Sequence, residues 1–492
     1  MGQRHQIGTH FRQDLRCSFV DVYAYLNVDF PTQLAGLLPE LSLRQPGKHM
    51  HGETAAHDRT AIRSAPENAI GGPASLKSLL PLYAVVFAGF VGYSLMITVF
   101  TPMIMSNHNF LLPPDEPMSR RVIVLGFLLC LYPLGQFVGS PVLGALSDRF
   151  GRKPVLMISL IFTTVCYALI GIALELRSFA LLGCASLLAG LAEANVVAAQ
   201  SAIADVIMPE ERNRFFGYIY LSASSAYIVG PLVGGKLADP DLVSWFSDAT
   251  PFWAAMILLG ITTAATAFLF RETNPPARRH AVSLTQAFTN LRSVVSDRRL
   301  RRLYWLNFAF YLAIFGFFRC YPMYLVDRFH LGVSRMSEFV AWVGIPIVIA
   351  NAWVTGFLAA RFRTSTLAAA SAFLTGVFMI AVVGFHPRAS LWVTLFLTSG
   401  ALAICLPACA TFLSRAASEM EQGRVMGNNQ ALQVGAEALS GLIGGLAAAA
   451  FVALPLILLG LLAILAALLL MFGAGHRKEV SSASLGESIS TQ

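Results

Sequence analysis

The chain alternates long apolar stretches with short polar ones. Apolar runs of about twenty residues recur from residue 79 to residue 472, and a run of that length crosses about 30 Å of hydrocarbon as a helix. The pattern predicts twelve transmembrane helices, six on each side of a polar stretch. The predicted spans are 79–105, 121–145, 154–174, 178–205, 214–236, 251–271, 303–326, 338–360, 366–385, 390–413, 424–448 and 451–472.

The spans group into two six-helix bundles with polar segments around them. We predict a cytoplasmic N-terminal tail, an N-terminal bundle, a basic cytoplasmic linker, a C-terminal bundle and a cytoplasmic C-terminal tail at 1–76, 77–271, 272–302, 303–473 and 474–492. The N-terminal tail is polar, has no sustained period and lacks the apolar core of a secretory signal. We therefore expect it to be largely disordered, with Met50 as an alternative start.

The two predicted bundles share internal repeats. Two sets recur at a constant offset: Gly144, Arg149 and Phe150 as Gly356, Arg361 and Phe362, and Glu211, Arg214, Gly217, Gly234 and Gly235 as Glu421, Arg424, Gly427, Gly444 and Gly445. Repeated halves of this kind place a substrate path at their interface, near the middle of the bilayer.

Composition supports an all-α polytopic membrane protein. The chain is 56% hydrophobic and 13% charged, whereas about 25% of the residues of a soluble domain are charged. The net charge of +8 lies mostly in alternate loops, so the positive-inside rule places both termini in the cytoplasm. We expect no nucleic-acid partner. Cysteines and histidines form no ligand pattern, so neither a metal nor a cofactor is expected.

One charged loop carries a resemblance to a known family. Residues 144–154 read Gly-Ala-Leu-Ser-Asp-Arg-Phe-Gly-Arg-Lys-Pro. Gly144 would let two helices approach closely, and Gly151 permits a turn that other residues resist. The stretch resembles the G-x-x-x-D-R-x-G-R-K loop between helices 2 and 3 of the major facilitator superfamily. The resemblance implies the major facilitator fold, with twelve helices in two pseudo-symmetric bundles. It assigns a cytoplasmic gating role to Gly144, Asp148, Arg149, Gly151, Arg152 and Lys153.

The fifth predicted span carries a second motif. Its members are Gly217, Ala226, Gly230, Pro231, Gly234 and Gly235. Glycines four residues apart flatten one helix face for close packing, and a proline removes an intrahelical hydrogen bond. The pattern resembles the antiporter motif of the twelve-helix drug:proton antiporters, with alanine at position 226 in place of one glycine.

The end of the fourth span resembles the tetracycline-efflux branch of that family. It reads Ile-Ala-Asp at 203–205, followed by an acidic–basic loop and a Phe-Gly start at 216–217. The resemblance implies a cytoplasmic charge cluster of Asp148, Arg152 and Asp205. It also places Asp148 at the N-terminal end of the eleventh helix, near Arg424, in a contact of about 0.3–1 kcal/mol. That contact would hold an outward-open state and release in an inward-open one.

Three charged residues lie inside predicted spans: Glu193, Arg319 and Glu437. Each costs at least about 2.5 kcal/mol at mid-membrane, so such a residue normally faces a cavity. Gln200 shares a helix face with Glu193, and Gln430 and Gln433 share one with Glu437. We predict that these faces line a substrate cavity and that a glutamate carries the coupled proton. The simpler interpretation is that each glutamate is a neutral packing residue.

Other features of the spans leave the coupling route open. Arg319 could bind an anionic group, pair with a glutamate or extend to the membrane surface. The first span has no acidic residue, and Ser186 stands where many family members carry an arginine, so Glu193 and Glu437 are argued from burial alone. Five aromatic residues could also line an apolar pocket: Tyr93, Tyr220, Tyr227, Tyr311 and Phe315.

Together these features predict a proton-coupled secondary active transporter that exports a small amphiphilic compound or drug by alternating access. We expect a monomer, multi-pass in a bacterial cytoplasmic (inner) membrane. One alternative is a proton-coupled symporter that imports an anionic metabolite, with Arg319 as the substrate anchor. A second is a non-transporting membrane sensor. No nucleophile–base pair or Walker-type loop supports an enzyme or an ATP-driven pump.

Overall fold

The structure is a computed structural model of the full chain. It describes residues 76–106, 111–193, 195–207, 212–274, 292, 294–385, 387–418 and 421–489. The predicted N-terminal tail up to residue 75, Met50 included, lies outside these ranges, as does most of the predicted linker. The described residues are helices joined by short loops, and no strand occurs among them.

The N-terminal half contains seven described helices, which account for the first six predicted spans. They are α2 (Leu76–Met105), α3 (Met118–Phe150), α4 (Arg152–Glu175), α5 (Phe179–Glu193), α6 (Asn195–Val206), α7 (Arg212–Leu237) and α8 (Thr250–Leu269). The fourth span comprises α5 and α6.

The C-terminal half accounts for the other six predicted spans. Its elements are α10 (Arg301–Phe329), α11 (Val333–Ile349), the π-helical turn η2 (Ala350–Val354), α12 (Thr355–Arg361), α13 (Thr364–Gly384), α14 (Arg388–Ala416), α15 (Gln422–Ala448) and α16 (Leu454–Ile489). The eighth span comprises α11, η2 and α12. In α16 the helix continues past its apolar stretch, which ends at Met471, into the predicted polar tail.

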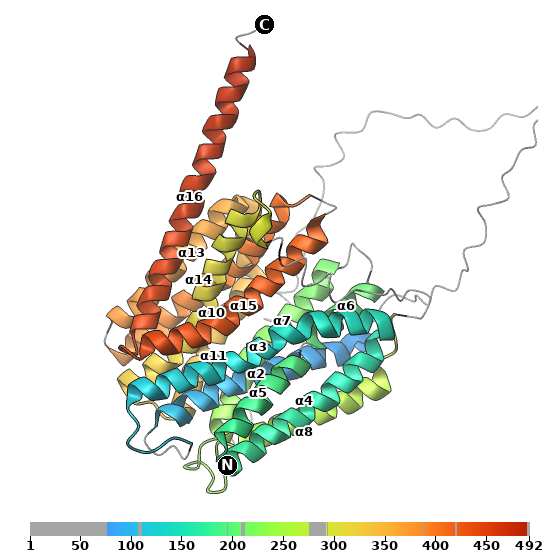
Figure 1. The fold of residues 1–492 in the computed structure, drawn as a ribbon, viewed down its shortest axis with the longest axis vertical. Helices are drawn as coiled ribbons and strands as arrows, with labels where there is room; N and C mark the ends of the chain where they lie inside the picture. Colours follow the sequence, from blue (N-terminus) through green and yellow to red (C-terminus); the bar gives the residue numbers. More distant parts are fainter. Residues whose placement is uncertain are drawn as a thin grey trace, which may run out of the picture. The chain divides into compact units, whose positions relative to one another are not determined.

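Eleven spans among the described helices are long and apolar enough to cross a membrane. The remaining predicted span is α7, a continuous helix in which glycine, serine, tyrosine and arginine lower the mean hydropathy. Figure 1 shows α2 to α8 grouped on one side and α10 to α16 grouped on the other. The predicted all-α fold of two helical bundles is confirmed.

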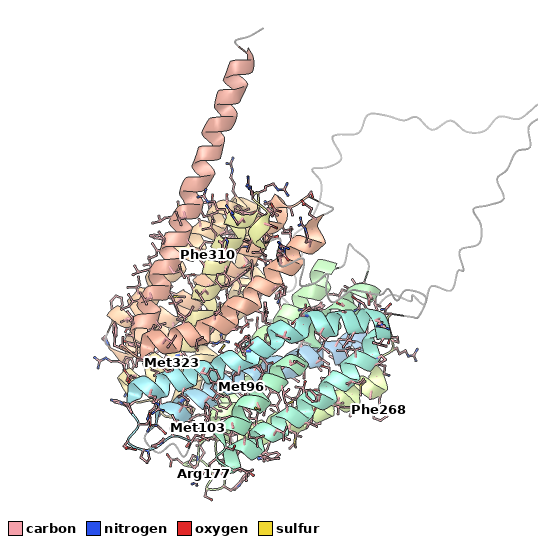
Figure 2. All side chains as sticks on the ribbon, in the orientation of Figure 1. Met96, Met103, Arg177, Phe268, Phe310 and Met323 are labelled. Atoms are coloured by element: carbon pink, nitrogen blue, oxygen red, sulfur yellow. The ribbon has the colours of Figure 1, made fainter. Side chains whose placement is uncertain are left out.

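Large apolar side chains lie on the outer surface of the helices. Phe268 of α8 is 87% exposed, and Ile158, Ile261 and Trp353 are also exposed. Figure 2 shows Phe268 at the outer edge of its bundle. Soluble monomers rarely expose apolar surface on this scale, so these side chains suit contact with lipid tails.

The two halves share one part of their core. Met96 and Met103 of α2 pack in one buried cluster with Met323 of α10 (Figure 2). Helix α3 packs along α15, and α7 packs along α11. Because α3 and α11 are each the second span of a half, and α7 and α15 are each the fifth, these two contacts are related by the internal repeat.

Candidate functional site

Glycines bring α3 and α15 into backbone contact at one end of the molecule. A Cβ added at Gly126 would lie 2.5 Å from the carbonyl oxygen of Gly441 and 2.8 Å from the Cα of Gly445. A Cβ at Gly445 would lie 2.6 Å from the carbonyl oxygen of Val122. No side chain fits there, so the two helices meet through glycine. This end is the one that the sequence predicts to be external.

A matching contact joins α7 and α11 at the same end. Gly235 faces Ser337 and Val333 of α11, while Gly230 and Gly234 face Ser94 and Leu95 of α2. The glycines predicted to form an antiporter-type motif therefore contact both a helix of their own half and one of the other half. In the C-terminal half, Gly444 is the repeat partner of Gly234 and faces α10. Gly445 is the repeat partner of Gly235 and faces α3. We call the two contacts, α3–α15 and α7–α11, the external seam.

The other end of the helices, predicted to be cytoplasmic, is different. Cβ atoms added at Gly144, Gly217, Gly356 and Gly427 would meet no described atom within 4 Å. The close helix approach predicted at Gly144 is not formed in this structure. The repeat-related glycines are therefore tightly packed at one end and uncovered at the other.

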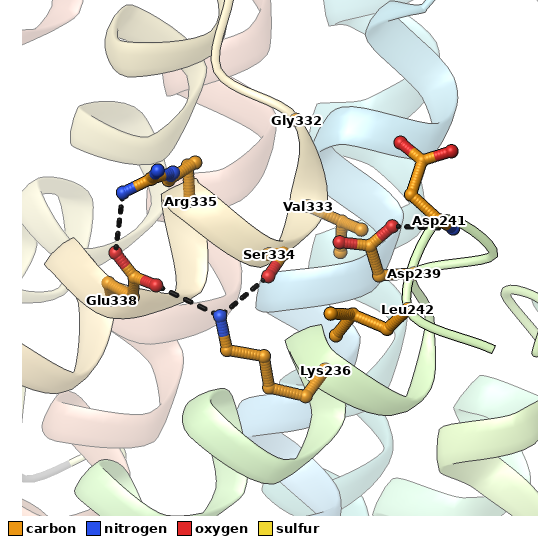
Figure 3. Close-up of a pocket in the computed structure, with 9 residues that line it drawn as sticks. All are labelled: Lys236, Asp239, Asp241, Leu242, Gly332, Val333, Ser334, Arg335 and Glu338. Carbon is orange, nitrogen blue, oxygen red and sulfur yellow. Dashed lines mark hydrogen bonds and ion pairs between the residues drawn. The ribbon is translucent and has the colours of Figure 1, made fainter.

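A pocket of about 570 Å³ lies at the external end between α7 and α11 (Figure 3). Lys236 of α7 donates to Ser334 Oγ at 2.8 Å and pairs with Glu338 at 2.9 Å, both on α11. Arg335 lies 3.7 Å from the same carboxylate. Lys236 is nearly half exposed, so this ion pair between the halves contributes about 0–1 kcal/mol.

Glu193 lies deep inside the N-terminal half. Its side chain is 2% exposed, and the Tyr167 hydroxyl donates to its Oε2 at 3.3 Å. Tyr132 lies beside the same carboxyl group. A Cβ on Gly89 of α2 would lie 2.5 Å from Glu193 Oε1, so glycine makes room for it. No lysine or arginine among the described residues pairs with Glu193. Burial of an ionised carboxylate without a counter-charge is costly.

Glu437 has different partners. The Tyr93 hydroxyl of α2 donates to Glu437 Oε1 on α15. Arg319 of α10 donates to the Tyr93 oxygen at 2.7 Å and lies 3.5 Å from Glu437 Oε1. Arg319 is fully buried and Glu437 is 7% exposed. Of the alternatives left open for Arg319, the structure shows the pair with a glutamate, and the buried guanidinium does not extend to the membrane surface.

Four tyrosines connect the two carboxyl groups. The rings of Tyr93 and Tyr132 stack with centroids 5.0 Å apart, and Tyr227 meets Tyr93 edge-on at 6.4 Å. Tyr227 lies close to Glu193, Glu437 and Arg319. We call Tyr93, Tyr132, Tyr167 and Tyr227 the tyrosine cluster. It places both glutamates in one buried polar region where the two halves meet.

Burial increases along the predicted polar face of α15. On α15, Gln430 is exposed, Gln433 is half-buried and Glu437 is buried, so the face runs from the open end towards the seam. Gln200 on α6 is half-buried. Of the predicted aromatic residues, Tyr93 and Tyr227 join the buried region, and Tyr311 bonds to Asn429. Phe315 is buried and Tyr220 is exposed.

The charged loop at 144–154 forms a compact cluster. Arg152 pairs with Asp148 at 2.6 Å and with Asp205 at 2.9 Å, so one guanidinium joins the ends of α3, α4 and α6. Gly151 has φ 104°, a backbone conformation that favours glycine. Arg149 lies over the ring of Phe150, with its Cζ 5.2 Å from the ring centroid.

Glu272 completes this cluster and was missed from the sequence. Its carboxylate accepts from the backbone N–H groups of Arg152 at 2.8 Å and Lys153 at 3.1 Å. Lys153 Nζ in turn donates to the carbonyl oxygen of Ala267 at 2.8 Å. A carboxylate at a helix N-terminus satisfies orphan donors and complements the helix dipole. The only sequence signal was an acidic residue just after the sixth span.

The predicted contact between Asp148 and the eleventh helix is not formed. Arg424, in the first turn of α15, pairs with Glu421 at 2.7 Å and lies 3.9 Å from Asp297. Asp148 pairs with Arg152 in its own half. The described ion pairs at this end stay within one half, which is the arrangement that the sequence hypothesis assigns to an inward-open state.

Comparison with known proteins now decides the family. Residues 82–364, more than half of the chain, match the Major Facilitator Superfamily. The chain is 30% identical over 319 residues to the class C tetracycline resistance protein of Escherichia coli, covering 62% of this chain and 75% of that protein. The chain belongs to the major facilitator superfamily. Within the superfamily it lies in the drug:proton antiporter branch, among the tetracycline resistance proteins.

Two further comparisons agree. The chain is 26% identical over 338 residues to the mouse major facilitator superfamily domain-containing protein 10, covering 64% of this chain and 70% of that protein. The crystal structure of the human organic anion transporter MFSD10 (TETRAN) superposes with a TM-score of 0.62 at 19% identity, covering 81% of this chain and all of that one. As a superfamily member, the chain is a multi-pass integral membrane protein and a secondary transporter.

Sequence reasoning missed two further features of this superfamily member. Arg121 is fully buried and donates to five backbone carbonyls, those of Ile104, Ser106, Pro113, Pro114 and Glu116. These bonds hold the α2–α3 loop together. Gly126 was also missed, because its partner glycines lie on α15, more than 300 residues away.

Proposed function

We propose that this transporter is a proton-coupled antiporter that exports a small amphiphilic compound. The observation that carries the proposal is the environment of Glu193, which is 2% exposed and, among the described residues, hydrogen-bonds to tyrosine and pairs with no lysine or arginine. A carboxyl group desolvated in this way can bind and release protons near neutrality when its surroundings change. The proposal also draws on relatives that are named for tetracycline resistance.

The balance of buried charge explains why a proton and a cation would exclude one another. Arg319 compensates Glu437, so ionised Glu193 leaves the buried region with one uncompensated negative charge. Either a proton on Glu193 or one positive group of the substrate can neutralise it. Both together would leave an excess positive charge in a medium where that is costly. Exclusion of this kind is what exchange of substrate for proton requires.

The two ends of the molecule support alternating access. The external seam is closed through glycine contacts, while the corresponding glycines of the other end are uncovered. Rocking of the halves about the tyrosine cluster would open the seam and bring Asp148 towards α15. We infer that the protein works in a bacterial cytoplasmic membrane with both termini inside, as a monomer, with the bilayer, protons and one small molecule as its partners.

Transport by purified protein in liposomes tests this function. With a pH gradient imposed, we expect uptake of tetraphenylphosphonium or tetracycline into vesicles that are acidic inside, together with proton efflux. Replacing Glu193 with glutamine should abolish the uptake that the pH gradient drives. Slow exchange of internal for external compound should remain. Absence of any flux with a folded protein would favour the sensor alternative.

A second candidate function rests on Arg319. Its Nε has no hydrogen-bond partner among the described residues, and Nη1 reaches only the Phe315 carbonyl oxygen, at 3.4 Å. A guanidinium with unused donors suits a carboxylate, and protonation of Glu437 would release it for that role. An anion and a proton would then bind together, which gives symport. An aromatic carboxylate such as benzoate, carried in the same direction as the proton, would identify this function.

A further inference from the structure

We propose that Tyr93 is a positioning residue whose hydroxyl joins the ionisation of Glu437 to closure of the external seam. Tyr93 comes from the N-terminal half, whereas Arg319 and Glu437 come from the C-terminal half. The proposal does not depend on the transported compound or on the direction of transport. It assigns Glu437 to holding the halves together and leaves Glu193 as the proton carrier.

The hydrogen bonds of Tyr93 have a fixed direction. Arginine can only donate, so the Tyr93 oxygen accepts from Arg319 Nη2 at 2.7 Å. The tyrosine proton is then directed to Glu437 Oε1, which accepts it. A hydroxyl placed between a guanidinium and a carboxylate is oriented from both sides. This arrangement is strongest when Glu437 is ionised, because charge-assisted hydrogen bonds are roughly twice as strong as neutral ones.

The ring of Tyr93 is held by its own half. It stacks on Tyr132 of α3 with centroids 5.0 Å apart, and Tyr227 of α7 packs edge-on against it at 6.4 Å. Tyr93 is 7% exposed. Its rotamer is therefore fixed by packing, and the hydroxyl reaches across to α10 and α15. Separation of the halves has to break both hydrogen bonds.

We call Tyr93, Arg319 and Glu437 the triad. The triad lies directly beside the external seam. Gly441 is one helical turn beyond Glu437 on α15, and a Cβ there would lie 3.0 Å from the Gly126 carbonyl oxygen and 3.4 Å from Arg319 Cδ. The glycine contact and the polar triad therefore share one stretch of α15. Loss of the triad should loosen the α3–α15 contact next to it.

Protonation of Glu437 has two effects that act in the same direction. It weakens the bond from Tyr93, and it leaves Arg319 buried without its counter-charge, which is strongly unfavourable. Among the described residues, the titratable groups near this pair are Tyr93 from α2, Tyr227 from α7, Cys130 from α3 and Cys320 on α10 itself. Opening of the external seam would hydrate Arg319, so the protonated triad favours the open seam.

Distances between spin labels at the external end test this link. Labels are placed at exposed Leu176 and Phe451, one in each half, with Cys17 and Cys184 replaced by serine. No substrate and no proton gradient are present. With the triad unsubstituted, the distance between the two labels should be short at alkaline pH. A growing population of longer distances should appear as the pH falls. In Tyr93→Phe the longer distances should be present at every pH, and the pH dependence should be lost.

Two further variants make the outcome decisive. Glu437→Gln mimics the protonated carboxyl group and should reproduce the longer distances even if Tyr93→Phe fails to fold. Tyr321→Phe is the matched control, because it removes a buried hydroxyl on α10 that has no partner among the described residues. It should behave as the unsubstituted protein. Short distances in both Tyr93→Phe and Glu437→Gln at all pH values would overturn the proposal, whatever the transport assays show.

Discussion

At the scale of single residues, the two buried glutamates have different surroundings. Glu193 has tyrosine hydroxyls around it and no described cation, whereas Glu437 is paired with Arg319 and bonded by Tyr93. The guanidinium offsets part of the cost of burying the Glu437 carboxylate, and Glu193 has no such partner among the described residues. The sequence identified both glutamates and Arg319. It could not show which glutamate the arginine joins, because that depends on how α10 and α15 are rotated.

Gly151 gives a direct prediction for the charged loop. Its φ of 104° lies where a side chain is strained, so Gly151→Ala should lower the free energy of unfolding by about 1–3 kcal/mol. Thermal unfolding of the purified protein measures this. Gly144→Ala is the control on the preceding helix α3, because a Cβ there meets open space and the backbone is helical. Equal destabilisation by the two variants would contradict the assigned backbone conformation.

Glu421 gives a prediction of pH dependence outside the membrane. Hydrogen bonding from Ser418, with help from Arg299 and Arg424, lowers the pKa of Glu421 below its usual range. A depressed pKa adds stability above the unfolded-state pKa of this carboxyl group, and that stability is lost as the pH falls through the folded-state pKa.

Glu421→Gln should therefore unfold at a lower temperature than the unsubstituted protein near neutral pH, and the difference should shrink in acid. Unfolding temperatures over a pH series measure it. A difference that stays constant from neutral to acidic pH would show that the carboxylate charge is not what stabilises this site.

At the scale of helices, the contacts between the halves depend on glycine faces. Helix α7 presents Gly230 and Gly234 to α2 and Gly235 to α11, and α15 presents Gly444 to α10 and Gly445 to α3. The spacing in α7 predicted a face for close packing. The partner helices did not follow from spacing, because an isolated helix carries no information about its neighbour.

The external seam gives a prediction at this scale. Gly445→Val places a branched side chain against the Val122 carbonyl oxygen, and overpacking of this kind costs about 1–3 kcal/mol. The closed seam should become less populated, while Gly427→Val on the same helix should have no such effect.

Reactivity of a cysteine at position 122 measures seam opening, since Val122 is buried in the closed state. With Cys17 and Cys184 replaced, the Val122→Cys thiol should react slowly with a membrane-impermeant reagent and faster when combined with Gly445→Val. An unchanged rate in the Gly445→Val background would show that this glycine contact does not hold the seam.

The described fold was largely predictable, and the reason is physical. Apolar runs of membrane length, such as 303–326 and 390–413, correspond to α10 and α14, because backbone hydrogen bonds must be satisfied within a helix in lipid. Contacts made by isolated charges were less predictable. Arg121 and Glu272 bond to backbone groups, and such partners leave no pattern in side-chain sequence.

At the scale of the whole transporter, the external seam is closed and the end that the sequence predicts to be cytoplasmic is uncovered, which corresponds to one state of the proposed alternating-access cycle. In both halves, the repeat-related glycines are packed at one end of the molecule and uncovered at the other. This difference between the ends is therefore a property of the conformation and not of one helix. In the proposed cycle, Glu193 exchanges a proton for the positive group of the substrate. The Tyr93 triad and the Lys236–Glu338 pair hold the seam until it opens.

Proton release from purified protein in weakly buffered detergent tests this cycle most directly. Addition of tetraphenylphosphonium or tetracycline should release protons in proportion to the compound bound. Glu193→Gln should abolish the release, and Glu175→Gln, which changes an exposed carboxylate outside the tyrosine cluster and the external seam, should leave it intact. Release that persists in Glu193→Gln and disappears in Glu437→Gln would contradict the assignment of the proton to Glu193.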